Sequence, residues 1–568
     1  MAEEVWMLQT KKADFKQIGA RFRIDPVTAR IIRNRGIEGE AAIDRYLNGT
    51  LDDLYDPMLL KDMECAVSIL CEAVDTGKKI RIVGDYDGVC STYILLQAFE
   101  RLGSDVDFEI PDRIKDGYGI NESIIEQAHA DGVEVILTCD NGISAFHQVE
   151  LAKKYGMTVV ITDHHEVPLD GEKEKIPPAD AVIDPKQADC PYPFPEICGA
   201  VVAYKLVQVL YARRGVPQME WLDLLEFAAI ATVGDVMKLQ DENRILVKYG
   251  LKKMAQTKNL GLRRLAEKNN LDLGAITAYH IGFVIGPCLN AGGRLKTAKE
   301  ALALLRAQSE EEAERLAEEL KELNDTRKDM TEQGTEAAKL QVESWYQKDK
   351  VLVVFLPECH ESLAGIIAGR LREYYQKPAI VLTRGEEAVK GSGRSIDEYH
   401  MFKKLTEVSD LLLKFGGHPL AAGLSLEEEN IDEFRRRLNE NAGLTEEDFK
   451  AKVWIDVPMP VGYVTERLVR ELSCLEPFGQ GNEKPLFAEK SLRIRASRVL
   501  GRNRNVVKMT LEETDGHAIE ALYFGDGTAF EEERAGRREI DVVYYPDINE
   551  YNGRKTLQAV IRRYKFRG

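Results

Sequence analysis

The sequence predicts an α/β protein in which two α/β domains are joined by a long helix and followed by a small C-terminal β-barrel. From about residue 56 to 296, and again from 346 to 450, apolar runs of strand length alternate with amphipathic helical patterns. This alternation is typical of mainly parallel sheets with helices on both faces. Residues 297–345 are rich in Ala, Glu, Leu and Lys at helical spacing. Residues 486–568 contain short runs typical of strands.

Composition limits the class of protein. The chain has 568 residues, enough for about three to four domains. Its net charge of −18, from 77 basic and 95 acidic residues, argues against indiscriminate coating of nucleic acid but is compatible with a local basic groove. The sequence has no run of about 18 apolar residues, no signal-peptide pattern and no Cys-x-x-Cys pair. We therefore expect a cytoplasmic protein without a disulfide framework or zinc ribbon.

The first segment, residues 1–55, contains short helical patterns and no evident chemistry. Asp25 and Pro26 are typical of a capped helix start. We expect this segment to cap the domain that follows it.

Polar side chains end the strands of the first α/β domain. The run Val159–Thr162 has the length of a buried strand and stops at Asp163, His164 and His165. Open α/β sheets bind ligands at the carboxyl ends of their strands. Two adjacent histidines alone are more often solvated loop residues. Three further apolar segments, however, are also followed by a carboxylate: Ile80–Gly84 by Asp85 and Asp87, Val133–Cys139 by Asp140, and Ala228–Gly234 by Asp235. The last of these segments could equally end a helix.

One aspartate after a strand is usually a helix cap or a turn residue. Four such sites in one region, with carboxylate and imidazole but no cysteine, indicate a different role. Oxygen and imidazole donors suit two hard divalent cations, magnesium or manganese rather than zinc.

Several glycine-rich segments could face a substrate. Pro111–Gly119 carries Arg113, and Gly286–Leu295, interpreted as a turn whose amides could cradle phosphate, carries Asn290 and Arg294. In the second α/β domain the corresponding segments are Gly391–Ser395, with Ser392 and Arg394, and Phe415–Gly423, with Gly417 and His418. Ordinary surface loops and tight turns are the alternative interpretation. Glycine beside Arg, Ser and His allows close approach to a sugar-phosphate, and Arg can form a fork onto a phosphate.

The C-terminal strands concentrate positive charge. Arg502 and Arg504 are two of several basic residues between 490 and 508, and more follow at 562–567. A basic β-barrel with exposed aromatic rings suits single-stranded nucleic acid, through phosphate neutralisation and base stacking. A solvated basic face on a structural barrel is the alternative.

These segments together resemble the DHH phosphoesterases. Asp163-His164-His165 is similar to their defining motif, and Phe415–Gly423 is similar to the glycine-rich segment of their DHH-associated domain. The segment Leu475–Asn482 and the C-terminal barrel point to the single-strand-specific 5′-to-3′ exonucleases of that family. The resemblance implies a cap segment (1–55), a DHH catalytic domain (56–296), a connecting helix (297–345), a DHH-associated substrate-binding domain (346–450), and a linker with an OB-like nucleic-acid-binding barrel (451–568).

The resemblance also implies roles. Metal ligands would be Asp85, Asp87, Asp140, His164 and Asp235, with Asp140 between two manganese or magnesium ions. His165 would contact the scissile phosphate, and Asp163 would orient its neighbours. Arg113, Ser392, Arg394 and His418 would hold the 5′ end. The implied reaction is hydrolysis of single-stranded DNA to mononucleotides in DNA repair and recombination, with a helicase and a single-strand-binding protein as partners.

The chain departs from the family pattern at two places. Relatives usually carry Asp-Tyr-Asp-x-Asp-Gly, whereas Asp85-Tyr86-Asp87-Gly88 is two residues shorter and has one carboxylate fewer. Relatives often have Arg where this chain has Cys288. Two alternatives therefore stay open: a phosphodiesterase for short oligoribonucleotides or cyclic dinucleotides, and a catalytically impaired relative that binds single strands.

Overall fold

The computed structural model describes residues 4–85, 88–111, 119–551 and 553–567. These residues form two compact units. The first unit contains Tyr55–Met237 and Tyr249–Ala451, and the second contains Trp6–Leu54, Lys238–Lys248 and Lys452–Gly568. Among the described residues, no helix is both long enough and apolar enough to cross a membrane.

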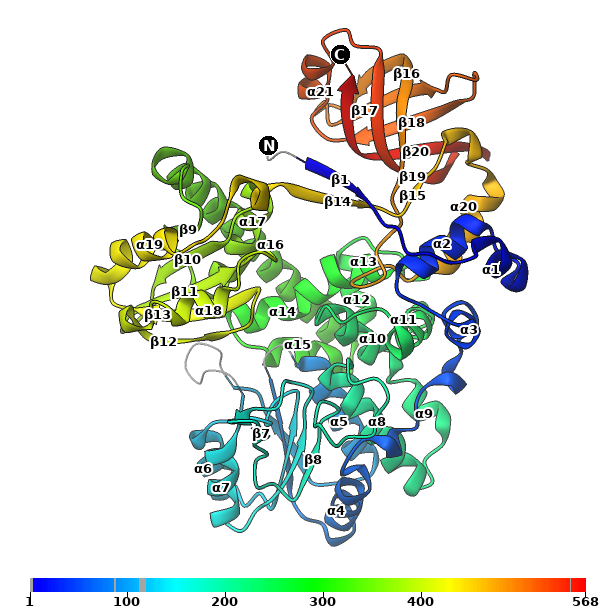
Figure 1. Ribbon diagram of the computed structural model, residues 1–568. Helices are drawn as coiled ribbons and strands as arrows, with labels where there is room; N and C mark the ends of the chain where they lie inside the picture. Colours follow the sequence, from blue (N-terminus) through cyan, green and yellow to red (C-terminus); the bar gives the residue numbers. More distant parts are fainter. Residues whose placement is uncertain (1–3, 86–87, 112–118, 552, 568) are drawn as a thin grey trace. The chain divides into compact units, whose positions relative to one another are not determined.

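A five-stranded parallel sheet is the centre of the first half of unit one, as the sequence predicts (Figure 1). All five residues of β2 and all five of β4 are buried, which explains their continuous apolar runs. Neighbouring strands pair Gly84 with Cys139, Cys139 with Thr162, and Thr162 with Ile183, so their carboxyl ends are level. In sheet order the strands are β3 (Val106–Glu109), β2 (Ile80–Gly84), β4 (Val135–Cys139), β5 (Thr158–Thr162) and β8 (Ala181–Ile183).

Helices cover both faces of this sheet, which confirms the expected layering (Figure 1). Residues of α6 and α7, such as Ile125 and Val149, share a buried core with Ile136 and Ile161 of the sheet. The opposite face packs against α4, α5 and α8. The helices on the two faces are α4 (Met63–Thr76), α5 (Val89–Arg101), α6 (Glu122–Ala130), α7 (Phe146–Lys154) and α8 (Gly199–Arg213), and α9 (Gln218–Leu222) packs against α8.

Two segments of this region are helical: Ala228–Gly234 takes the helical alternative that the sequence left open, and the interpretation of Gly286–Leu295 as a turn is wrong. Ala228–Gly234 is not a strand but the end of helix α10 (Leu225–Gly234), whose alanine-rich sequence packs against α5 and α8. Gly286–Leu295 is not a turn but helix α14. Because α14 continues a π-helical turn over Ile281–Ile285, its amides bond within the helix and cannot cradle a phosphate as a loop would.

Further helices complete this half of the unit and connect it to the second sheet. The long α16 contains 32 residues and confirms the predicted connecting helix. Ser309 caps its first turn by accepting a hydrogen bond from the Glu312 amide. The set is α11 (Asp241–Met254), of which only the part from Tyr249 belongs to unit one, α12 (Leu260–Lys268), α13 (Ala278–His280), α15 (Lys299–Arg306) and α16 (Glu310–Gln341), which continues into a π-helical turn (Val342–Tyr346).

The second sheet is mixed. β9 and β10 are parallel, and the other pairs are antiparallel. Its order is β12 (Leu412–Gly417), β13 (Ala421–Leu426), β11 (Val389–Arg394), β10 (Ala379–Arg384) and β9 (Leu352–Phe355), with helices α17 (Ala364–Tyr375), α18 (Met401–Thr406) and α19 (Ile431–Glu440).

Unit two contains the predicted C-terminal barrel. β16 pairs with both β17 and β19, so the sheet closes on itself. Its strands are β15 (Val457–Pro458), β16 (Phe487–Leu500), β17 (Val506–Glu512), β18 (Ala518–Phe524), β19 (Glu539–Tyr551) and β20 (Arg554–Arg567), with helices α20 (Glu466–Leu472) and α21 (Gly527–Arg534).

The N-terminal helices belong to the same unit as this barrel, which differs from the expected cap on residues 56–296. Asp25 caps α2 as predicted. Arg35 pairs with Asp456 at 2.6 Å, both side chains being 5% exposed, and Ile32 lies in one core with barrel residues. Local sequence could not show this partner because it lies more than 400 residues away. These helices are α1 (Phe15–Phe22), α2 (Pro26–Asn34) and α3 (Glu40–Asn48).

Candidate metal centre and nucleic-acid interface

The level strand ends place a row of aspartates at one edge of the parallel sheet. Asp85, Asp140, Asp163 and Asp184 each follow the last residue of a neighbouring strand. Of these, Asp140 has a backbone φ of 63°, which lies in the left-handed region. A non-glycine residue held there is strained, which is a common feature of functional sites.

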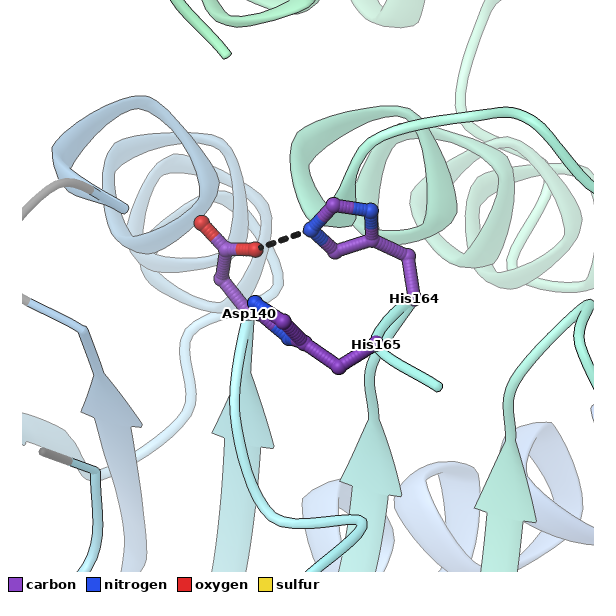
Figure 2. Close-up of side chains that lie close together, drawn as sticks. All are labelled: Asp140, His164 and His165. Carbon is purple, nitrogen blue, oxygen red and sulfur yellow. Dashed lines mark ion pairs between the residues drawn. The ribbon is translucent and has the colours of Figure 1, made fainter. Parts of the chain in front are cut away.

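Asp140, His164 and His165 converge at this edge (Figure 2). His164 Nε2 lies 3.0 Å from Asp140 Oδ1 and 3.6 Å from Asp235 Oδ2. One ligand atom from each of Asp140, His164 and His165 lies within 4.8 Å of the others. Donors that surround one cation at about 2.0–2.3 Å must lie within about 4.6 Å of each other. With small rotamer adjustments Asp140 and His164 can share a divalent ion, and His165 lies beside them.

The electrostatics of His164 favour a positive charge at this point. Burial lowers the pKa of His164, but the carboxylates of Asp140 and Asp235 outweigh burial and raise it. The same carboxylates would favour a bound cation in place of the proton, because a histidine ligand must be neutral.

Asp163 holds both histidines in position. Its Oδ1 accepts hydrogen bonds from the His164 amide at 2.8 Å and lies 2.7 Å from His165 Nδ1, and its Oδ2 accepts from the Ile143 amide at 2.9 Å. Burial acts to raise the pKa of Asp163, but the hydrogen bonds and the two histidines outweigh it and keep the pKa low. Burial alone would lower the pKa of His165, but its hydrogen bond to Asp163 and the charge of that carboxylate outweigh burial and raise the pKa to about 9. Asp163 is 1% exposed, so it orients its neighbours rather than meeting a substrate.

Glycine is needed where helices α5 and α8 begin. A Cβ on Gly199 would lie 2.4 Å from Asp140 Oδ1, and one on Gly88 would lie 3.0 Å from Asp140 Oδ2. Only glycine permits these helix ends to approach the carboxylate so closely. Both helix N-termini therefore lie beside Asp140.

Asp235 reaches the cluster from a helix rather than from the sheet. It is the C-cap of α10, and its side chain is 47% exposed. Asp85 is buried at the end of β2, beside Asp140 by strand register. Of the other predicted residues, Asp87 and Arg113 lie outside the described residues.

Sequence reasoning missed Asp184. This aspartate follows β8, is fully buried, and has its pKa raised to about 7 by burial, with the nearby Asp163 charge adding to the effect. The signal was present as Ala181-Val182-Ile183 before Asp184, but three apolar residues are too short a run to stand out.

The second sheet brings Ser392 and Arg394 together on β11. Arg394 Nη1 donates to Ser392 Oγ at 3.1 Å. Ser392 lines a pocket of about 490 Å³ together with Phe415 and Lys414. Gly417, with φ at 148°, and His418, whose amide donates to Ala421 O at 2.7 Å, form the turn between β12 and β13.

Asn290 and Arg294 lie on α14. Arg294 Nη1 donates to the Ser362 carbonyl at 3.4 Å. Arg327 of α16 was not predicted, yet its pKa is lowered by burial and by the charges of Arg294 and Arg370. Several arginines therefore gather beside α14, where anions would be stabilised.

Arg502 and Arg504 are exposed in the turn between β16 and β17. Arg504 Nε donates to Thr528 Oγ1 at 3.0 Å. Some basic residues of the barrel strands pair with acids, as Lys508 does with Glu520 at 2.8 Å.

Comparison with known proteins agrees with this architecture. Family models match the DHH family N-terminal domain at residues 79–232, the DHHA1 domain at 348–443 and the RecJ OB domain at 455–563. The single-stranded-DNA-specific exonuclease RecJ of Bacillus subtilis is 36% identical over 98% of this chain and 70% of its own length. The protein of the same name from Escherichia coli is 34% identical over 95% of each chain.

Solved structures show the same similarity. The crystal structure of RecJ in complex with Mn²⁺ from Thermus thermophilus has a TM-score of 0.84 at 28% identity, and the match covers 99% of this chain and 79% of that one. A RecJ structure from the same organism in complex with Mg²⁺ has a TM-score of 0.77 at 27% identity, and that match covers 99% and 78% of the two chains. The predicted fold, with two α/β domains, a long helix and an OB-type barrel, is confirmed.

Proposed function

This chain belongs to the RecJ family, and we propose that it is a metal-dependent exonuclease that hydrolyses single-stranded DNA from the 5′ end to mononucleotides. One observation carries the proposal: at the carboxyl edge of a parallel sheet, His164 Nε2 lies 3.0 Å from Asp140 Oδ1 and 3.6 Å from Asp235 Oδ2, and a ring nitrogen of His165 lies within 4.8 Å of the ligand atoms of Asp140 and His164. A set of carboxylate and imidazole donors suits manganese or magnesium.

Five residues of this cluster would be the metal ligands. Asp140, His164, Asp235 and Asp85, with Asp87, would hold two ions. Two bound ions supply Lewis acidity, lower the pKa of the attacking water and neutralise the entering and leaving oxygens of a phosphodiester.

His165 would contact the scissile phosphate. Its pKa of about 9 favours the charged imidazolium at neutral pH, and Asp163 fixes the ring through Nδ1. A positive charge held in place stabilises the negative charge that develops on the phosphate without further reorganisation.

Binding of the strand would involve the second sheet and the barrel. Ser392, Arg394 and His418, with Arg113, would hold the 5′ end, and Asn290 and Arg294 would contact the backbone. Arg502 and Arg504 of the barrel would hold the more distant strand, which a substrate of two or three nucleotides would not need. This argues against the alternative of a phosphodiesterase for short oligonucleotides.

We further propose the context of the reaction. Single strands for DNA repair and recombination would be supplied by a helicase and a single-strand-binding protein. The domain boundaries proposed above, at about residues 55, 296, 345 and 450, would separate cap, catalytic, connecting, substrate-binding and barrel segments.

The test uses 5′-labelled and 3′-labelled single strands with Mn²⁺, beside the matching duplex and a short RNA. Release of mononucleotides from the 5′ end of the single strand alone supports the proposal. Release from the 3′ end, equal cleavage of the duplex, or binding without cleavage would overturn it, and the last result would support the impaired-relative alternative raised by the short Asp85–Gly88 motif.

Variants localise the activity. Asp140→Ala and His164→Ala should abolish hydrolysis and spare strand binding, while Asp170→Ala, at an exposed carboxylate of the same half of the unit, should change neither. Thermal melting must show that all three variants are folded. Unchanged hydrolysis in Asp140→Ala would contradict the assigned centre.

A further inference from the structure

A second pocket lies in unit one, away from the metal centre. It has a volume of about 690 Å³, within the range of small-molecule sites. Residues from α5, α8, α9 and α10 line it, together with the segment between α11 and α12 and the end of α15. Glu226 in the first turn of α10 lines the pocket, and Asp235 caps the other end of the same helix. The pocket is therefore separated from the Asp235 end by about 13 Å, at about 1.5 Å per residue.

Glu226 presents a buried oxygen without a partner. Its side chain is 4% exposed, and Oε1 accepts a hydrogen bond from Thr257 Oγ1 at 2.6 Å. Oε2 is buried and has no hydrogen-bond partner among the described residues. An unsatisfied buried carboxyl oxygen is costly, and a donor that reached it from the pocket would remove that cost.

Aromatic rings line the pocket beside this carboxyl. The rings of Tyr93 and Phe227 pack with centroids 4.4 Å apart, and Tyr211 also lines the pocket. The Tyr93 hydroxyl accepts a hydrogen bond from Asn259 Nδ2 at 3.1 Å, which leaves its own hydrogen to donate. The two rings are tilted by 49°, and Tyr93 and Phe227 are 7% and 2% exposed, so the wall offers a small apolar area beside one acceptor and one donor, which a heterocyclic base can contact.

The rim carries more positive than negative charge. Lys253 and Lys258 share one carboxylate, Asp223, at 2.5 and 3.2 Å. One aspartate cannot neutralise two lysines, so these three side chains together carry a net positive charge. Lys258 is 85% exposed and can turn towards an anion without disturbing the fold.

We propose that this pocket binds a nucleoside 5′-monophosphate, with N–H groups of the base at Glu226, the base against Tyr93 and Phe227, and the phosphate at Lys253 and Lys258. This is the class of molecule that the proposed nuclease reaction releases. The binding itself does not depend on that reaction.

The test is calorimetric titration of the full-length protein with dGMP, dAMP, dCMP and dTMP, with EDTA present so that divalent ions are absent. Deoxyguanosine and inorganic phosphate are the partial ligands. We expect saturable binding of at least one mononucleotide. Glu226→Gln keeps the acceptor for Thr257 but replaces Oε2 by an N–H₂ group, and it should weaken binding about tenfold or more.

Two further variants locate the ligand. Lys258→Ala should weaken mononucleotide binding about threefold and leave nucleoside binding unchanged. Asp140→Ala should leave all binding unchanged, because Asp140 belongs to the metal centre. Thermal melting of each variant checks its fold.

The proposal is overturned if no mononucleotide binds, if Glu226→Gln binds as wild type does, if inorganic phosphate binds as tightly as the mononucleotides, or if Asp140→Ala abolishes binding. Exonuclease assays on the same preparations keep the two proposals apart. Activity without Glu226-dependent binding would leave the proposed function intact, and binding without activity would leave only the pocket.

Discussion

Gly199→Ala should disrupt the metal centre without a large effect on the fold. Gly199 is the first residue of α8, and its missing side chain faces Asp140. A Cβ placed there would lie 2.4 Å from Oδ1, 2.7 Å from Cγ and 2.8 Å from Cβ of Asp140. Since three atoms of Asp140 are crowded, including the one next to its backbone, rotation of the carboxylate alone cannot relieve the overlap.

The magnitude follows from two opposing effects. Forcing a methyl group into a packed site costs about 1–3 kcal/mol. Replacing glycine by alanine in a helix returns up to about 1 kcal/mol. We therefore expect the free energy of unfolding to fall by about 0–3 kcal/mol, a change that leaves the protein folded. Affinity for Mn²⁺ should fall about 10- to 100-fold, as is usual when the support of a metal ligand is altered.

The assay combines Mn²⁺ titration, thermal melting and the exonuclease rate on a 5′-labelled single strand. Gly234→Ala is the matched control, because Gly234 adjoins Asp235 but a Cβ there would have no neighbour within 4 Å. This control should bind Mn²⁺ and cleave DNA as the wild type does. Wild-type Mn²⁺ affinity in Gly199→Ala would refute the assignment of Asp140 as a ligand in this geometry.

Three other predictions concern named side chains. Asp163→Asn removes the negative charge that raises the pKa of His165 to about 9 in the metal-free protein. Without that charge, the pKa of His165 should fall towards its ordinary value of 6.5 or below. NMR titration of the imidazole tests this, and an unchanged pKa would contradict it. Burial raises the pKa of Glu226 from 4.5 to about 7, so the folded protein binds the extra proton between these values. The free energy of unfolding should therefore decrease by about 3 kcal/mol as pH rises from about 4.5 to 7. In urea unfolding measured across this pH range, Glu226→Gln should not show this decrease. Replacing Arg502 and Arg504 by Ala should weaken single-strand binding and reduce its salt dependence by about 1.4 in log–log slope, at about 0.7 per phosphate contact; an equal slope in wild type and variant would remove this turn from the DNA path.

The architecture and most of the central cluster can be recognised in the sequence. Strands of the parallel sheet are recognisable because they are buried on both faces and therefore continuously apolar. Asp140 and Asp163-His164-His165 could be singled out because polar residues that end such runs must lie at the carboxyl edge of the sheet. The OB-type barrel was also recognisable, since its strands alternate and are separated by glycine-containing turns.

Which distant elements meet depends on tertiary packing. Asp235 reaches His164 from the end of a helix, and Gly199 matters only because α8 begins beside Asp140. Asp184 became visible only once β8 was placed next to β5. The N-terminal helices pack with residues more than 400 positions away, and the pocket at Glu226 is assembled from several separate segments. The spacing of apolar residues predicts that one face of an element is buried, but it does not identify the element that packs against that face. Many elements could pack against the same apolar face, and only the folded chain shows which one does.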